Sequence, residues 1–242
     1  MKALVFNGSP RMDHGNTALI LTPFVEGMRE CGAEVEVFYT SRLHINPCLG
    51  DFNCWFKSPG ACHQQDDIQL LHPKLRGTDV WVFATPLYVW GVSGPMKNLM
   101  DRLVPLVEPA IRLRHGHCTH PLREDTPPAK VVLVSNCGFW EMDNFHPLLA
   151  QFEMFCRTVG FEFAGALLRP HGPLLGAMLE MGAAVHDVLD AAREAGRQLV
   201  QHGAISGDML KTVSRELLPK STYLEMANKE FEHELAMGTA AR

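Results

Sequence analysis

The sequence has no long hydrophobic run. Its apolar stretches, such as residues 80–84, are about five residues long, whereas an α-helix needs about 20 apolar residues to cross a bilayer. The first ten residues hold one charge and a short apolar run, without the longer apolar stretch and cleavage site of a secretory signal peptide. We therefore expect no membrane segment and a cytoplasmic location.

A surplus of positive charge is also absent. Lys and Arg number 22 against 27 Asp and Glu, which gives a formal net charge of −5 at pH 7. Without a basic field the chain cannot hold a nucleic acid backbone or an anionic membrane surface, so we expect neither partner. Hydrophobic residues make up 46% of the 242 residues and charged residues 20%, which is typical of a globular protein and excludes a disordered chain.

Two kinds of motif are missing as well. The number of cysteines, seven, is odd and no export signal accompanies them, so we predict reduced thiols rather than a disulfide framework. Neither the Walker pattern G-x-x-x-x-G-K-[ST] nor G-x-G-x-x-G is present. This absence excludes the commonest P-loop and dinucleotide-binding sites.

What the sequence does contain is a regular alternation of short apolar runs and helical periodicities. The expected strands are residues 3–6, 35–38, 80–84, 131–134 and about 162–168, and the expected helices are about residues 16–31, 66–76, 95–106, 144–160 and 183–202. Alternation of this kind requires right-handed crossovers and a parallel sheet covered by helices on both faces. Five such strands suit an α/β, flavodoxin-like, doubly wound sheet.

The expected domain spans residues 1–203. Residues 204–242 form an extension whose segment 207–235 is polar and helix-prone, and we expect this helical extension to pack on the domain or on a second subunit. Residues 43–63 lack periodicity and predict an ordered loop, which at this length is usually functional. Residues 108–128 predict an irregular insertion whose His115, His117, Cys118 and His120 we interpret as an exposed polar loop rather than a metal site.

Polar residues follow the first expected strand and continue into the first turn of a helix. Ser9, Arg11, Asn16 and Thr17 supply hydroxyl, guanidinium and amide donors, and ligands in such sheets lie beyond the carboxyl ends of strands. A loop of this kind can hold an anion, and a single terminal phosphate fits it best. A plain polar turn with an N-cap is the alternative.

The loops after the third and fourth strands combine aromatic surface with backbone donors. The first contains Tyr88 and Trp90, and the second runs from Ser135 to Trp140. A planar heterocycle needs apolar walls and amides at its edge. Packing of Tyr88 and Trp90 in the core is the alternative.

An ordered set of motifs resembles the flavodoxin-like NAD(P)H-dependent FMN reductases, in particular the branch related to iron-sulfur flavoproteins. The motifs are residues 7–11 with 15–17, residues 48–62 followed by Asp66 and Asp67, and residues 84–88 with 94–98 and 101–102. The resemblance implies FMN as the cofactor and NAD(P)H as the hydride donor. It also implies a small-molecule electron acceptor such as a quinone, an azo or nitro compound or free flavin, and assembly into a homodimer or homotetramer.

The resemblance assigns cofactor-binding roles to three groups of residues. These are the phosphate loop with Ser9, Arg11, Asn16 and Thr17, the ring loop with Pro86, Leu87, Tyr88, Val89 and Trp90, and the loop with Asn136, Cys137 and Gly138. The flavin carries the chemistry, so no catalytic side chain is expected. The alternatives are an electron carrier of the flavodoxin type without efficient NAD(P)H oxidation, an iron-sulfur flavoprotein, and a flavin-free protein.

The cysteine loop departs from the pattern of the related iron-sulfur flavoproteins. Their C-x2-C-x2-C motif and a fourth cysteine bind a [4Fe–4S] cluster. Here Cys48, Cys54 and Cys62 remain, but Asp51 stands at the second position, and a carboxylate suits cluster iron poorly. We therefore expect no [4Fe–4S] cluster and no bound metal, and we interpret the thiols as reduced residues that pack a loop over the flavin. A zinc site and a redox switch between two thiols are the alternatives, and Asp101 and Arg102 are expected to form a structural ion pair.

Overall fold

The computed structural model describes residues 1–238 and contains a five-stranded parallel sheet in the order β2-β1-β3-β6-β7. The strands are β1 (Lys2–Asn7), β2 (Glu34–Tyr39), β3 (Val80–Pro86), β6 (Lys130–Asn136) and β7 (Glu162–Arg169). The helices are α1 (Asn16–Glu30), α2 (Asn53–Phe56), α3 (Ile68–Arg76), α4 (Gly94–Asp101), α5 (His146–Val159), α6 (Gly172–Glu180), α7 (His186–His202), α8 (Gly207–Ser214) and α9 (Lys220–Met237). The predicted doubly wound, flavodoxin-like sheet is confirmed.

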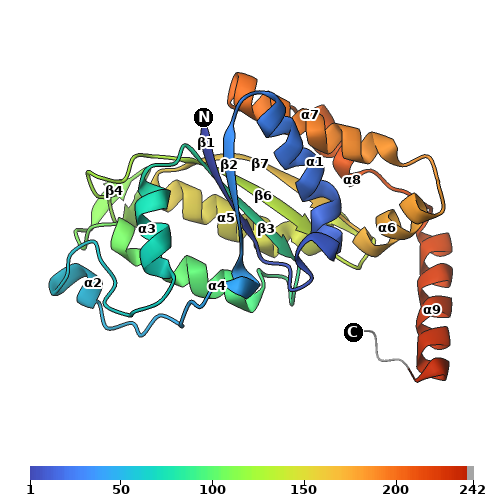
Figure 1. Cartoon of the computed structure of the whole chain (residues 1–242), viewed down its shortest axis with the longest axis horizontal. Helices are drawn as coiled ribbons and strands as arrows, with labels where there is room; N and C mark the ends of the chain where they lie inside the picture. Colours follow the sequence, from blue (N-terminus) through green and yellow to red (C-terminus); the bar gives the residue numbers. More distant parts are fainter. Residues whose placement is uncertain (239–242) are drawn as a thin grey trace.

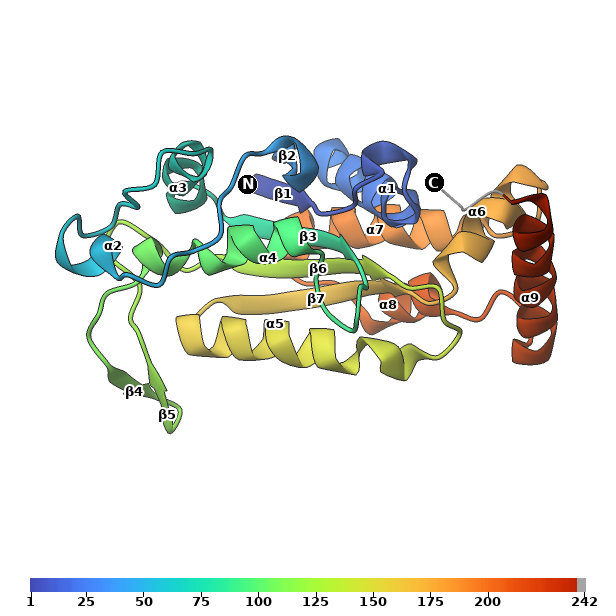
Figure 2. The ribbon, with the colours of Figure 1, turned by 90° about the horizontal axis from the view of Figure 1, so that it is seen from below.

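Each face of the sheet has its own apolar core. Successive residues along β1 and β3 point to opposite faces of the sheet. Val5 and Val82 pack against α1 and α7, whereas Phe6 and Phe83 pack with α3, α4 and α5. Strands buried on both faces read as continuous apolar runs, which is why the sequence revealed them. Figures 1 and 2 show the helices on both sides of the sheet.

Helices α1 and α7 pack with their backbones in close contact because each has a glycine facing the other helix. A Cβ at Gly27 would overlap the backbone of Arg193, and a Cβ at Gly196 would overlap the backbone of Phe24. The absence of both side chains lets the two backbones approach closely.

Four segments differ from the sequence-based expectation. The helix expected to end at residue 106 ends at Asp101 and is followed by a short 3-10 turn (Val104–Leu106). The insertion contains a hairpin of β4 (Arg112–Arg114) and β5 (His117–Thr119), α2 interrupts the long loop, and α6 precedes α7. These elements are short, and a four- to nine-residue segment carries too little periodicity to be predicted.

The extension after residue 203 begins on the domain and then leaves it. Helix α8 packs against α7 and β7, whereas α9 stands away from the sheet at the end opposite the β4–β5 hairpin (Figures 1 and 2). Residues 239–242 of the predicted extension lie outside the described residues. Within residues 1–238, no helix has both the length and the apolar character of a membrane span.

Candidate functional site

The topological switch point of the sheet lies between β1 and β3. The chain passes from β1 to β2 on one side and returns to β3 on the other, so the loops after β1 and β3 diverge at the carboxyl edge of the sheet. The two loops are tied together where they leave the strands, because the amide of Gly8 donates to the carbonyl of Ala84 at 2.6 Å. The polar loop and the aromatic loop predicted from the sequence therefore lie side by side.

The loop after β1 is preorganised and open to an anion. The amide of Ser9 donates to Asn7 Oδ1 at 2.9 Å, and the Ser9 side chain is buried beside Gly15, where a Cβ would overlap Ser9 Oγ. Gly15 is the N-cap of α1, and within residues 1–238 no side chain caps the helix there. The amides of the first turn are thus free of a side-chain acceptor, as they are at the starts of the other described helices such as α4 and α5, so an anion could bind them here.

Two residues of the predicted phosphate loop differ in exposure. Arg11 is exposed beside the loop, whereas Thr17 is buried and its Oγ1 accepts a hydrogen bond from Asn136 Nδ2 at 2.6 Å. Asn16, half-buried, opens α1 and lies next to Gly176 of α6. Arg11 is therefore free to bind a ligand, while Thr17 links the first and third loops of the site.

The loop after β3 forms a strained two-residue turn. Tyr88 and Gly91 exchange two backbone hydrogen bonds of 3.0 Å, and both residues between them have positive φ, 48° at Val89 and 58° at Trp90. These are the φ signs of a type I′ turn, which normally takes Asn or Gly, and a β-branched residue there is strained. The turn points three side chains outward: Tyr88 is 51% exposed, Val89 90% and Trp90 53%. The alternative that Tyr88 and Trp90 pack in the core is wrong.

The third loop holds the site together rather than lining it with free donors. The carbonyl of Asn136 accepts from the amide of Leu87 at 2.8 Å, and the amide of Cys137 donates to the carbonyl of Arg169 at 3.1 Å. The Cys137 side chain is buried, which raises the pKa of its thiol, and Tyr223 donates to the carbonyl of Gly138. Trp90 Nε1 donates to Asn144 Oδ1 at 3.2 Å, just beyond this loop.

The structure adds polar groups that sequence reasoning missed. Asn7 Nδ2 and Ser93 Oγ are buried and have no hydrogen-bond partner within residues 1–238. Both lie at the junction of the first two loops, since a Cβ on Gly8 would come within 2.8 Å of Ser93 Oγ. Unpaired buried polar atoms are costly, so a polar ligand at this edge would gain by satisfying them. The sequence signals that could have identified these two residues are the position of Asn7 at the end of a strand and the position of Ser93 in a Gly-rich loop.

The cysteine loop lies elsewhere. Cys48, Cys54 and Cys62 line one pocket with Arg102 and Val104, beyond the C-terminal end of α4, whereas the candidate ligand site lies at its N-terminal end. Figure 1 shows α2, which carries Cys54, at the opposite end of the molecule from α6. The pocket thus lies away from the candidate ligand site of the same chain, and the interpretation of the loop as a cover over the flavin stays a prediction. The chain leaves β2 at the carboxyl edge and then runs back along α4.

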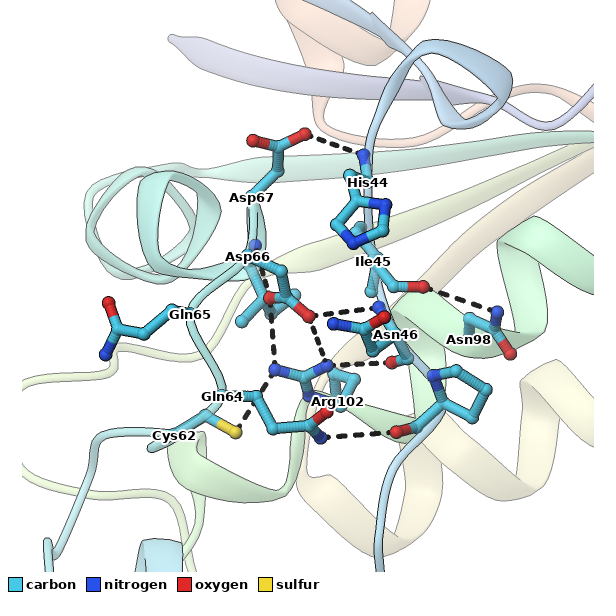
Figure 3. Close-up of polar contacts among 12 residues, drawn as sticks. His44, Ile45, Asn46, Cys62, Gln64, Gln65, Asp66, Asp67, Asn98 and Arg102 are labelled. Atoms are coloured by element: carbon cyan, nitrogen blue, oxygen red, sulfur yellow. Dashed lines mark hydrogen bonds and ion pairs between the residues drawn. The ribbon is translucent and has the colours of Figure 1, made fainter.

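The expected Asp101–Arg102 ion pair is also wrong. Arg102 is buried and binds the buried carboxylate of Asp66 with distances of 2.7 and 3.1 Å (Figure 3). Asp101 instead pairs with Lys97 on the surface at 2.5 Å. Successive helix residues point in directions about 100° apart, so Arg102 faces inward when Asp101 faces water. Burial opposes the charge of Asp66, but its contact with Arg102 and backbone amides hold its pKa below the usual value.

The histidines of the insertion form no metal centre. His115 and His117 are exposed on the hairpin, and the ring of His120 lies 4.7 Å from that of Trp55. Within residues 1–238, no group of three or more His, Cys, Asp or Glu side chains is arranged to hold a metal ion.

Asp51, which stands at the second position of the cysteine motif, is bound by Asn53. The backbone and side-chain N–H groups of Asn53 donate to the Asp51 carboxylate at 3.0 and 2.9 Å.

The fold and the loops at the carboxyl edge of the sheet define the class of this protein. It is a flavodoxin-like α/β protein with a candidate ligand site at the switch point of the sheet. Residues 1–117 match the family model described as NADPH-dependent FMN reductase, so the resemblance drawn from the motifs is confirmed for this part of the chain. An iron-sulfur flavoprotein of Methanocaldococcus jannaschii is 36% identical over 106 residues, 44% of this chain and 53% of that protein. The chain spans about half the length of the iron-sulfur flavoproteins it matches.

Two solved structures share the fold across most of the chain. The NAD(P)H:quinone oxidoreductase from Methanothermobacter marburgensis superposes with a TM-score of 0.57 at 20% identity, covering 84% of this chain and 98% of that one. An FMN-dependent NADH-azoreductase from Bacillus anthracis, solved in complex with FMN, gives a TM-score of 0.57 at 13% identity, covering 83% and 99%.

Proposed function

We propose that this chain binds FMN at the carboxyl edge of β1, β3 and β6 and oxidises NAD(P)H, passing the electrons to a small-molecule acceptor such as a quinone or an azo compound. The observation that carries the proposal is the juxtaposition of an uncapped helix start with an exposed, strained aromatic turn. The helix start has the donors for a terminal phosphate, and the aromatic turn has the apolar surface for a planar ring. The match to the reductase family supports the same assignment.

The residues of the site fit FMN. Arg11, Ser9, Asn16 and the amides after Gly15 would hold the phosphate, and Tyr88, Val89 and Trp90 would lie against the ring, with Leu87 and Pro86 fixing the base of their turn. Bound FMN supplies hydride and electron transfer, so the protein needs no acid or base of its own. The unpaired Asn7 Nδ2 and Ser93 Oγ would gain partners from the polar atoms of the ligand.

A flavodoxin-type electron carrier is the second candidate, and the exposed turn bears on the choice. An electron carrier needs only ring-edge access, whereas a hydride donor must lie against a ring face. Because the turn of Tyr88, Val89 and Trp90 is widely exposed, a ring that lies against it would keep its other face open to a hydride donor. This favours the reductase.

The cysteine loop does not fit a [4Fe–4S] cluster. Asp51 replaces the second thiolate and is bonded to Asn53, and the thiol of Cys62 accepts a hydrogen bond from Arg102 Nη2 at 3.2 Å. A cluster needs four soft ligands directed at one centre. We therefore propose a plain FMN enzyme.

The first experiment is the visible spectrum of protein purified without oxygen, with iron and sulfide assays and a test of NADH and NADPH oxidation. We expect flavin bands near about 370 and 450 nm, no stoichiometric iron, and reduction of the bound flavin by at least one nicotinamide. Colourless protein that takes up no added FMN would contradict the cofactor. Bound FMN that neither nicotinamide reduces would favour the electron carrier, and stoichiometric iron and sulfide would restore the cluster.

The phosphate loop is tested by Gly15→Ala. The backbone of Gly15 suits alanine, with φ −88° and ψ 157°, but the added Cβ would overlap Ser9 Oγ and displace the loop. We expect FMN to bind at least about tenfold more weakly, a loss of roughly 1.4 kcal/mol, as measured by quenching of FMN fluorescence on titration into apoprotein. Gly207→Ala is the matched control, because a Cβ there meets nothing within 4 Å. Equal affinities of the two variants would place the phosphate elsewhere.

A further inference from the structure

The pocket beyond the C-terminal end of α4 collects three of the seven cysteines. We call it the cysteine pocket and define it by Cys48, Cys54, Cys62, Asp51 and Arg102. It lies away from the candidate flavin site, and its thiols do not fit a cluster. The pocket also contains the buried guanidinium of Arg102, which pairs with Asp66 and contacts one of the thiols.

The backbone closes a loop between the two partly buried thiols of the pocket. The amide of Gly60 donates to the carbonyl of Cys54 at 3.0 Å, which closes the chain into a loop two residues before Cys62. Cys54 and Cys62 both line the pocket and are partly buried, whereas Cys48 is exposed. Burial, and then the charges of Cys62 and Cys48, raises the pKa of the Cys54 thiol.

Arg102 distinguishes Cys62 from the other thiols. Its guanidinium is buried and is fixed by Asp66 and by the carbonyl of Asn46 at 2.7 Å, and its Nη2 donates to Cys62 Sγ at 3.2 Å (Figure 3). Burial alone would lower the pKa of Arg102, but the contacts with Asp66 and Cys62 outweigh it and raise that pKa. The cation is therefore permanent, and it faces a sulfur that is only partly buried.

We propose that Cys62 is a modification site for hydroperoxides and that Cys54 is the thiol that resolves it. A sulfur that attacks an O–O bond does so as a thiolate, and Arg102 Nη2 lies 3.2 Å from Cys62 Sγ, where it can donate to that anion. The sulfur of Cys62 takes one oxygen from the hydroperoxide to form a sulfenic acid, and the hydroperoxide is reduced to the alcohol, or to water for hydrogen peroxide. The thiol of Cys54 then attacks the sulfenic sulfur, a disulfide forms, and the hydroxyl leaves with a proton as water.

The disulfide would join α2 to the segment before α3. A small thiol or a dithiol reductant restores both cysteines by thiol–disulfide exchange. The proposal does not depend on flavin binding, because its groups all lie at the other end of α4.

The test treats the full-length, air-equilibrated protein with hydrogen peroxide and follows each cysteine by timed alkylation and peptide mass spectrometry. Cys118, exposed on β5, is the reference thiol within the same molecule. We expect Cys62 to be oxidised at least about tenfold faster than Cys118, and a Cys54–Cys62 disulfide to form that dithiothreitol reverses. In Cys54→Ser the expected product is a sulfenic acid at Cys62 that dimedone traps, whereas Cys118→Ser should still form the Cys54–Cys62 disulfide.

Either of two results would overturn the proposal. The first is oxidation of Cys62 no faster than that of Cys118. The second is a disulfide that joins Cys48 to either partner in place of the Cys54–Cys62 bond.

Arg102→Lys separates the role of the guanidinium from that of the fold. Lysine keeps a charge for Asp66 but cannot bind both Asp66 and Cys62 with one planar fork. We expect oxidation of Cys62 to slow at least about fivefold relative to Cys118 in the same protein, with an unchanged circular dichroism spectrum. An unchanged ratio in a folded variant would remove Arg102 from the proposal.

Discussion

At the scale of single residues, two buried arginines show two ways of holding a charge away from water. Arg102 is neutralised by the carboxylate of Asp66. Arg169 has no such acid: it donates to the carbonyls of Pro170, Val213 and Arg215 at 2.8, 2.7 and 2.6 Å. Burial, and next the charge of Arg215, lowers the pKa of Arg169 to about 10, so it stays protonated at pH 7. It therefore ties the segment before α9 to the end of β7.

Arg169 also sets the protonation of the buried His171. Arg169 Nη2 and the amide of Leu217 both donate to His171 Nε2, at 3.0 and 3.3 Å, so this nitrogen is an acceptor and the ring is neutral. Burial, and then the charge of Arg169, lowers the pKa of His171 to about 4.

The stability of the fold should consequently fall in mild acid. The unfolded chain takes up a proton at His171 near its ordinary pKa of about 6.5, whereas the folded chain does so only near 4, so stability is present above pH 6.5 and is lost as the pH falls below it. This one group should cost about 2 kcal/mol of unfolding free energy between pH 7 and pH 5. Urea unfolding at both pH values measures it.

His171→Asn is the control for this pH dependence. Asparagine tolerates the positive φ of 40° at this position, keeps an acceptor for Arg169 and does not titrate. The variant should lose about 2 kcal/mol less than the unchanged chain over the same interval. Equal losses would assign the acid sensitivity to other groups.

At the scale of elements, the turn after β3 is the clearest case of local sequence opposing local structure. Val89 and Trp90 occupy backbone conformations that suit Asn and Gly, and their side chains are exposed to solvent. Strain of this kind persists where the surrounding structure enforces it and is concentrated at functional sites. The flanking hydrogen bonds of Tyr88 with Gly91 and of Leu87 with Asn136 enforce it here.

Replacing Val89 and Trp90 by Asn-Gly, the preferred type I′ pair, should raise the stability of the apoprotein and weaken its binding of FMN. The double variant Val89→Asn, Trp90→Gly is expected to stabilise the apoprotein by about 1 kcal/mol and to weaken FMN binding, because strain and ring surface are both removed. Thermal unfolding and FMN titration measure the two effects. Val89→Asn alone keeps Trp90 and isolates the strain; unchanged FMN affinity in both variants would mean that the turn does not touch the cofactor.

At the scale of the whole molecule, the two projecting elements have opposite character. Within residues 1–238, α9 contains no buried residue, and Leu224, Phe231 and Leu235 are 48%, 64% and 82% exposed on one face of the helix. The helix carries four glutamates against two lysines, whereas the β4–β5 hairpin at the other end carries Arg112 and Arg114. The first turn of α9 contacts the domain, since Tyr223 donates to the carbonyl of Gly138 and Lys220 pairs with Glu141 at 2.5 Å, whereas the apolar face of its later turns is exposed. We expect a second copy of this chain to cover that face.

Truncation after Leu218 tests this assembly. We expect the full chain to be a homodimer or homotetramer by size exclusion with light scattering, and the truncated chain to be a monomer, because the apolar face of α9 is removed. The truncation retains the acceptors of Arg169 at Val213 and Arg215 but also removes the contacts of Tyr223 with Gly138 and of Lys220 with Glu141. Leu224→Ala, on the same face, should weaken the assembly without removing the helix. A full-length monomer at micromolar concentration would contradict the prediction.

Much of this protein was determined by its sequence alone. Parallel strands buried on both faces are continuous apolar runs, so the five strands, their alternation with helices and the flavodoxin-like sheet could be predicted. The polar residues after β1 and the aromatic residues after β3 could be placed at one edge because topology brings the carboxyl ends of neighbouring parallel strands together. These properties depend on period and order, which a sequence carries directly.

The tertiary structure decided what depends on direction and long-range contact. The partner of Arg102 is Asp66, 36 residues away, because the inward face of α4 selects it over the adjacent Asp101. The cysteines lie at the far end of α4 because the loop after β2 doubles back, which no local pattern records. The exposure of Tyr88 and Trp90 follows from a turn whose φ values their own propensities oppose, since contacts from β6 outweigh local preference.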